Sequence, residues 1–361
     1  MLELNQPIAR ELVGGQSHTY QVAARAGQYL EVMLDQRGED VAITLFAPNG
    51  QRIAQFDNDS REQGRESVAQ VVEAAGSFRL EVAPRRPDAT AGQYTIQLVA
   101  LRDATAQDRA AHEATRLSAE SLRLAGTGKP NEALPLADRA LQLREEALGA
   151  QHPDVAVALD RLATLFRDRQ EFARAEPLYL RALSIAEAQP APGHPDLALI
   201  LNNLGAMYML KAYWQQAEAR LLRALEVWEQ TLGPNHPNLA RALTNLGRVY
   251  NGKGDTAKAK SALQRALAIR ERELGLEHPQ LSGTLLNLGS LAYEEDDFAQ
   301  AEVYYQRLLP ILEKAGRMET EQGASILNSL AVIATDKRDF AQAESLYRRA
   351  QGIYEKVYSP D

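Results

Sequence analysis

The chain has 361 residues, a formal net charge of −8 and no cysteine. This acidic balance gives no electrostatic footprint for nucleic acid, and the lack of cysteine excludes disulfides, thiolate metal sites and a cysteine nucleophile. No apolar stretch approaches the roughly 20 residues that cross a bilayer, and the N-terminus does not resemble a signal peptide. We expect neither a nucleic-acid nor a membrane partner. We favour a cytoplasmic location, with an extracytoplasmic one open if an upstream signal was removed.

The first part of the sequence, residues 8 to 101, alternates apolar and polar residues with the period of two that is typical of strands. Pro48-Asn49-Gly50 and Ala75-Gly76 fit tight turns between them. Seven or eight short strands in about 100 residues predict a β-sandwich, which we place at residues 1–103. The predicted strands are residues 18–23, 29–34, 41–46, 52–56, 67–72, 78–82 and 94–99.

The rest of the chain repeats itself. His-Pro pairs begin at His152, His194, His236 and His278, each 42 residues after the last, and a fixed period of this size indicates a solenoid. Apolar residues within each unit recur at helical spacing on both sides of a break, so each unit is predicted to be two antiparallel helices. We expect about six units over residues 104–361, the first of them degenerate.

The ends of these helices can be predicted from capping chemistry. A proline in the first helical turn has no N–H to leave unpaired, which suits the His-Pro pairs, and glycine suits the end of each second helix at Gly149, Gly233 and Gly275. Pro310 falls inside the second helix of the fifth unit and predicts a bend near Leu309. The sequence ends where the next His-Pro pair would begin. We therefore expect either that it was cut from a longer chain or that its last helix needs a partner.

The third unit carries the pattern of a known family. Leu201, Leu204, Gly205 and Tyr208, followed by Ala217, Leu221 and Ala224, resemble the tetratricopeptide repeat. The 42-residue unit with its LNNLG and LGxxHP segments is similar to the kinesin light chain type, over roughly residues 110–361. The resemblance implies a multidomain, mainly α fold, with a β-sandwich followed by a right-handed α-solenoid. It also implies a non-catalytic protein-binding role.

A second resemblance concerns the first domain and the layout of the whole chain. The order of segments from GGQSHTYQV to AGQYTIQLV is similar to the pre-peptidase C-terminal type of sandwich. A sandwich followed by kinesin-light-chain-like repeats resembles the front half of bacterial chains that end in a caspase-like CHAT protease. The protease domain itself, with its histidine and cysteine, is absent from this sequence.

Several motifs could suggest chemistry, and each has a simpler interpretation. The histidines of the His-Pro pairs would be displaced from unit to unit, so we favour capping over metal binding. Asp57, Asn58 and Asp59, with Glu62 nearby, offer oxygen ligands but lack the glycine and terminal glutamate of a calcium loop, so we favour a solvated turn. No nucleophile elbow, phosphate loop or HExxH motif occurs. We therefore expect no enzyme activity and no cofactor.

The resemblance also assigns a binding groove to the concave side of the first helices. Asn203, Asn245 and Asn287 recur at one position, and an amide that both donates and accepts can hold the backbone of an extended peptide. Arginines beside the row would bind carboxylates. The alternative hypothesis is that these asparagines form hydrogen bonds within or between helices and serve packing alone. The candidate groove residues are Arg161, Arg167, Asn202, Asn203, Arg241, Thr244, Asn245, Arg248, Asn287, Ser290, Tyr293 and Asn328.

The sequence leaves three hypotheses about function open. The first is a scaffold that binds an extended, acidic partner segment in the groove. The second is the sensing arm of a CHAT-type protease, with its catalytic domain beyond Asp361 or supplied by another chain. The third is carbohydrate or calcium binding by the sandwich, which rests on Asp57 and Asp59 alone. We favour the first.

Overall fold

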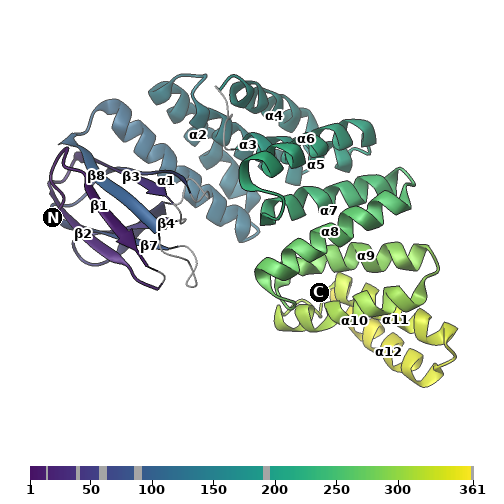
Figure 1. Cartoon of the computed structure of the whole chain (residues 1–361). Coiled ribbons are helices and arrows are strands. Elements are labelled where there is room, and N and C mark those ends of the chain that lie inside the picture. The colour runs from purple at the N-terminus through teal and green to yellow at the C-terminus, as the bar shows by residue number, and fades with distance from the viewer. Residues whose placement is uncertain (14, 38–40, 57–62, 85–91, 190–195, 359–361) are drawn as a thin grey trace. The chain divides into compact units, whose positions relative to one another are not determined.

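The computed structural model describes residues 1–13, 15–37, 41–56, 63–84, 92–189 and 196–358. Their contacts divide the chain into two compact units, Met1–Leu197 and Ala198–Asp361 (Figure 1). Among the described residues, the first unit holds the strands and four helices, and the second holds eight α-helices arranged in pairs. Of the helices described, none is both long and apolar enough to cross a bilayer.

The strands form two antiparallel four-stranded sheets. One sheet has the order β1-β8-β3-β6 and the other β2-β7-β4-β5. Leu30 and Ile96 from the first sheet, and Ile43 and Leu80 from the second, are fully buried in one shared hydrophobic core. The predicted β-sandwich is therefore confirmed. The strands are β1 (Ile8–Leu12), β2 (His18–Ala24), β3 (Gln28–Arg37), β4 (Val41–Phe46), β5 (Arg52–Phe56), β6 (Gln63–Val71), β7 (Gly76–Pro84) and β8 (Gly92–Asp103).

Strand β1 is the one strand among these that the sequence analysis did not identify. It has apolar side chains only at Ile8, Ala9 and Leu12, and three of its five residues are exposed. The strand forms because it pairs with β8, from Ile8 opposite Ile96 to Leu12 opposite Gly92. A partner 80 to 88 residues away in the sequence leaves no local pattern to read, since edge strands need not alternate.

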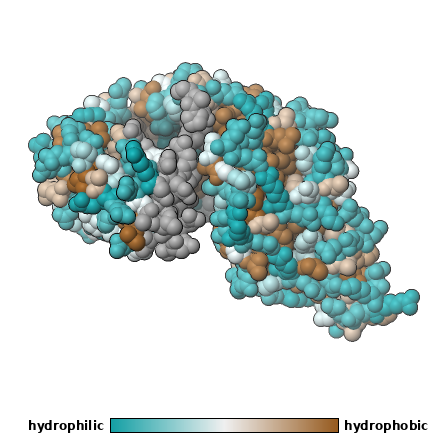
Figure 2. All heavy atoms as spheres, in the orientation of Figure 1, coloured by the Kyte–Doolittle hydropathy of each residue, from teal (hydrophilic) through white to brown (hydrophobic). Residues whose placement is uncertain are grey.

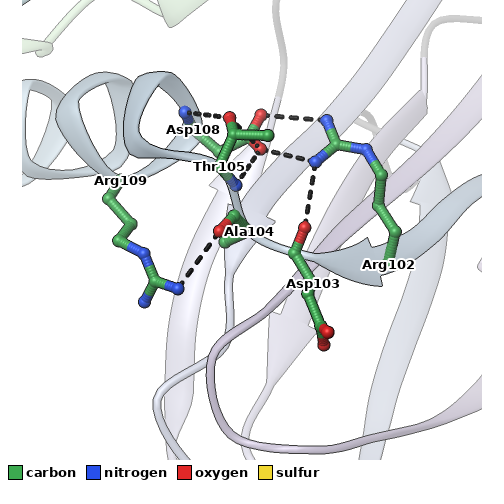
Figure 3. A network of polar contacts seen from close by, with 6 residues as sticks. All are labelled: Arg102, Asp103, Ala104, Thr105, Asp108 and Arg109. Atoms are coloured by element: carbon green, nitrogen blue, oxygen red, sulfur yellow. Dashed lines mark hydrogen bonds and ion pairs between the residues drawn. The ribbon is translucent and has the colours of Figure 1, made fainter.

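The last strand passes directly into the first helix, and a polar cluster holds the junction (Figure 3). Thr105 caps α1 and forms a reciprocal capping box with Asp108. Arg102, on β8, donates from Nη1 and Nη2 to the two carboxylate oxygens of Asp108 at 2.6 and 3.1 Å. Arg109 donates to the carbonyl oxygen of Ala104 at 3.1 Å. The helix start is therefore anchored to the end of β8 by charged hydrogen bonds.

The helices follow one another in pairs along the chain, two in each repeat, as predicted. In each pair we call the earlier helix the first helix and the later one the second helix. In the first unit they are α1 (Ala106–Gly126), α2 (Pro130–Leu148), α3 (Pro153–Asp168) and α4 (Phe172–Glu187). The second unit continues with α5 (Leu197–Leu210), α6 (Trp214–Leu232), α7 (Pro237–Gly252), α8 (Thr256–Leu274), α9 (Ser282–Glu294), α10 (Phe298–Lys314), α11 (Glu321–Asp336) and α12 (Phe340–Val357), with a short 3₁₀ helix, η1 (Pro279–Leu281), before α9.

The predicted caps are present. His152, His236 and His278 each stand at the N-cap, and each ring accepts a hydrogen bond at Nδ1 from the backbone N–H two residues later, at 3.2 Å. The capping interpretation of these histidines is thereby confirmed, and the pair at His194 lies outside the described residues. Gly149, Gly233 and Gly275 follow the second helices with φ of 89°, 83° and 81°, a conformation that strains other residues.

The two helices of a pair approach each other closely at a glycine of the first helix. A Cβ at Gly247 would lie 2.5 Å from the Leu263 side chain, and Gly205 and Gly289 face their own second helices in the same way. The backbone therefore needs glycine there for space rather than for its φ. Helix α10 runs unbroken through Pro310, so the predicted bend at that residue stays a prediction.

Candidate binding face

Four first helices of the second unit, α5, α7, α9 and α11, carry most of the predicted groove residues. We call the set of predicted groove residues on these helices, 202, 203, 241, 244, 245, 248, 287, 290, 293 and 328, the first-helix face. Hydrophilic residues predominate on the side of the repeats seen in Figure 2, with hydrophobic ones scattered among them.

Asn202 and Asn203 lie between helices rather than in the open. Their exposed fractions are 1% and 4%. Asn203 Oδ1 accepts from Arg241 Nη2 at 3.2 Å, and Asn202 Oδ1 accepts from Asn245 Nδ2 at 3.1 Å. These bonds join α5 to α7. The sequence analysis placed Asn203 in an open row of amides, whereas here it binds the neighbouring helix, as the packing alternative described.

Arg270, which the sequence analysis did not single out, joins the same surface from the second helix α8. Its Nη1 donates to Thr244 Oγ1 at 2.8 Å and also to the hydroxyl of Thr284, on α9. Thr284 is fully buried. Burial lowers the pKa of the Arg270 guanidinium, and the positive charge of Arg241 lowers it further. The residue was missed because the predicted groove was confined to the first helices, and Arg270 lies on the second helix α8.

Other residues of the first-helix face remain accessible. Arg248 and Asn328 are exposed, and Asn287 is half-buried; none of the three makes a hydrogen bond or ion pair within the part of the chain that the structure describes. Ser290, also half-buried, accepts a long hydrogen bond of 3.5 Å from Tyr305. Tyr293 packs its ring against Phe298 at a centroid distance of 5.4 Å. These side chains can therefore reach a ligand without breaking a strong contact.

Two predicted residues, Arg161 and Arg167, belong to the first unit. Arg161 is exposed, and Arg167 donates from Nε and Nη2 to the adjacent Asp168 at 2.9 and 2.7 Å. Both arginines lie on α3, so they are described here with the first unit by itself.

The sandwich contains the calcium candidate of the sequence analysis and one surface hollow. Asp57, Asn58, Asp59 and Glu62 lie outside the described residues, so the calcium alternative is not tested. Elsewhere, in the regions that are described, acidic and histidine side chains do not gather in groups of three that could hold a metal. A shallow hollow of about 930 Å³ lies over β1, β3 and β8 and is lined mainly by polar side chains, among them Glu11, Asp35, Arg37, Gln93 and Thr95.

Several solved structures have a fold similar to that of this chain. The chain is similar to BtubC (BKLC) from P. vanneervenii, with a TM-score of 0.52 and 23% identity over 72% of this chain and 95% of that one. It is similar to pilF of Pseudomonas aeruginosa, with a TM-score of 0.50 and 23% identity over 69% and 94%. A putative kinesin light chain from Podosopora anserina has a TM-score of 0.46 and 20% identity over 56% and 96%. At these identities the likeness concerns the fold alone.

Family models identify the repeats themselves. None of the curated proteins compared with the chain matches it. A tetratricopeptide repeat model matches residues 113–188, 196–272 and 251–314, more than half of the chain, and a second model of the same description matches residues 324–361. All these matches begin at residue 113 or later, so the resemblance of the sandwich stays a prediction. The repeats settle the family: this chain belongs to the tetratricopeptide repeat proteins.

Proposed function

We propose that the second unit binds an extended segment of a partner protein across the first-helix face. The family fold is generally a scaffold for protein–protein interaction, and this supports a binding role. The observation that carries the proposal is the set of polar side chains left without partners among the described residues, Arg248, Asn287 and Asn328, on three consecutive first helices. Because the first helices follow one another at the period of the repeat, we expect these side chains to face the same side of the array.

These side chains match the chemistry of an extended peptide. The amides of Asn287 and Asn328 can each donate to a carbonyl and accept from an N–H, and so can bind a backbone without selecting its sequence. Arg248 adds a positive charge that favours acidic residues beside that backbone. Because Asn202 and Asn203 are already bound between helices, we assign backbone binding to the later amides and a structural role to these two.

A peptide selection tests this proposal. We would select ligands for the full chain from a random peptide library and measure their affinity for the wild type, Arg248→Glu and Asn287→Ala. Both variants should bind more weakly, and Arg248→Glu should lose part of the salt dependence, because an exposed charge pair contributes about 0.2–1 kcal/mol and is screened by ions.

The matched control is Arg348→Glu, which reverses an exposed charge on the second helix α12 and should leave affinity unchanged. Asn245→Ala serves as a structural control. It should lower the melting temperature, because it removes a bond to the buried Asn202. A library without binders, or binders that ignore both face variants, would contradict the proposal.

A further inference from the structure

The hollow of about 930 Å³ on the sandwich lies where β1, β8 and β3 run side by side (Figure 1). Glu11, Gln93 and Arg37 line it and stand opposite one another in the two ladders, so they form one row across three strands. All three are exposed, whereas Leu12 and Tyr94, the next residues along β1 and β8, are buried. The row therefore faces away from the hydrophobic core.

The side chains of this row have no partner in the part of the chain that the structure describes. None of the three makes a hydrogen bond or ion pair there, although Glu11 and Arg37 carry opposite charges. Neighbouring strands lie about 4.8 Å apart, so two strand spacings separate the backbone positions of Glu11 and Arg37 by about 10 Å. Gln93 stands between them with an amide that can donate and accept. The row thus offers a carboxylate, an amide and a guanidinium in that order.

Buried hydrogen bonds fix the strands that carry the row. The hydroxyl of Tyr94, on β8, lies 2.6 Å from that of Tyr20 and 2.7 Å from His18 Nδ1. Gln36, on β3, is 2% exposed, and its Oε1 accepts from the backbone N–H of Val41 at 3.0 Å. Groups on a rigid scaffold lose less conformational freedom when a ligand binds than groups on a loop do. The backbone beneath the row is therefore held in place before any ligand arrives.

The charges that line the hollow balance. They comprise two carboxylates, Glu11 and Asp35, and two guanidinium groups, Arg10 and Arg37. Arg10 already donates to the carbonyl oxygen of Ala9 at 3.2 Å, and Asp35 is also engaged. A polyanion or a polycation gains little from a site without net charge, whereas a ligand with one charge of each sign can pair both of them. The hollow therefore suits a zwitterion.

We propose that this hollow binds a free peptide of about three residues through both of its charged ends. The inference is independent of the proposed function, which concerns helices of the second unit. An extended chain spans at most about 3.3–3.6 Å per residue, so three residues cover the roughly 10 Å between the backbone positions of Glu11 and Arg37. Glu11 accepts from the α-ammonium group, Arg37 donates two parallel N–H groups to the α-carboxylate, and Gln93 bonds the peptide group between them.

The test measures the affinity of the full chain for trialanine by NMR titration. The comparison peptides are N-acetyl-trialanine and trialanine amide, each of which lacks one terminal charge, and free alanine, which is too short to reach both Glu11 and Arg37. Wild type should bind trialanine saturably. Each blocked peptide should bind about fivefold more weakly, as expected for the loss of one exposed charge pair, and alanine should also bind more weakly.

Two variants show which residue meets which end of the peptide. Glu11→Gln should remove the effect of the acetyl group and keep the effect of the amide, and Arg37→Gln should do the reverse. Arg52→Gln, an exposed change on β5 of the other sheet, is the matched control and should bind like the wild type. The melting temperatures should match that of the wild type, because the replaced side chains are exposed.

Three results would overturn the inference. Trialanine does not bind saturably, the blocked peptides bind as tightly as the free one, or Glu11→Gln and Arg37→Gln do not separate the effects of the two blocks. None of these results bears on the first-helix face, whose proposed ligand and variants belong to the second unit.

Discussion

Single glycines set how closely the two helices of a repeat can approach. In three successive pairs the first helix presents Gly205, Gly247 or Gly289 to a large side chain of the second, and an added Cβ would come within 2.8 Å of that side chain or closer. Leu263, opposite Gly247, is itself buried, so its side chain has little room to move away. The spacing of the helix pair therefore depends on one missing methyl group.

Replacing Gly247 by alanine should lower the free energy of unfolding by about 1–3 kcal/mol, because the new Cβ overpacks the contact with Leu263. Urea denaturation of the two proteins measures this difference. The control is Gly283→Ala on α9, where no atom lies within 4 Å of the added Cβ. That change should be neutral or stabilising by up to about 1 kcal/mol, since alanine favours helix. Equal loss in both variants would contradict the packing argument.

The start of α1 shows how one element is anchored to another. Asp108 closes the capping box with Thr105 and also binds Arg102 at the end of β8. The hydrogen bond from Arg102, followed by the bonds from Thr105, holds the pKa of the Asp108 carboxyl well below its usual range, against the opposing effect of burial. The charged form is therefore the one that holds helix and strand together (Figure 3).

The stability that Asp108 contributes should depend on pH. Its folded-state pKa is depressed, so its contribution is fully present above the unfolded pKa, near 3.8, and is lost as the pH falls toward the folded value. Asp108→Asn should be less stable than the wild type at neutral pH, and the difference should narrow below about pH 4. Denaturation curves at several pH values measure it. A difference that is constant down to about pH 2, or grows toward acid, would contradict the role of the charge.

At the scale of the repeat array, ion pairs join the second helices α6, α8, α10 and α12 in turn. Glu229 accepts from Arg265 at 2.5 Å, and Glu313 accepts from Arg349 at 3.1 Å. The pair of Glu271 and Arg307 stands between them. Each arginine follows its glutamate by 36 residues, so the pairs recur with the period of the repeat and link neighbours along the array.

A double-mutant cycle on Glu271 and Arg307 tests this link between repeats. Replacing both by alanine, singly and together, should show a coupling energy of about 0.2–1 kcal/mol, since both side chains are partly exposed, and added salt should reduce it. Glu344 and Arg348, a pair within α12, are the matched comparison because they do not connect repeats. If the variants of Glu344 and Arg348 lower the melting temperature as much as the variants of Glu271 and Arg307 do, the proposed link between repeats is contradicted.

The sequence alone determined the repeat and most of the element boundaries, because their causes are local. Proline at the first helical turn, histidine as N-cap and glycine at positive φ act within a few residues, so Pro237 and Gly275 mark real helix ends. The alternation of buried and exposed residues along β3 likewise reflects a two-residue period. These local patterns do not depend on which other helices or strands pack against the segment.

The tertiary structure decided which polar residues are available for binding. Asn203 and Asn287 occupy equivalent positions, yet Asn203 is buried against Arg241 while Asn287 stays partly open. Arg270 became a candidate only through its contacts with Thr244 and Thr284, on two other helices. Burial and hydrogen bonding of a side chain depend on residues some 40 positions away that only folding brings near. A periodic sequence therefore predicts the scaffold, whereas the accessibility of its polar side chains arises from the packing of one repeat on the next.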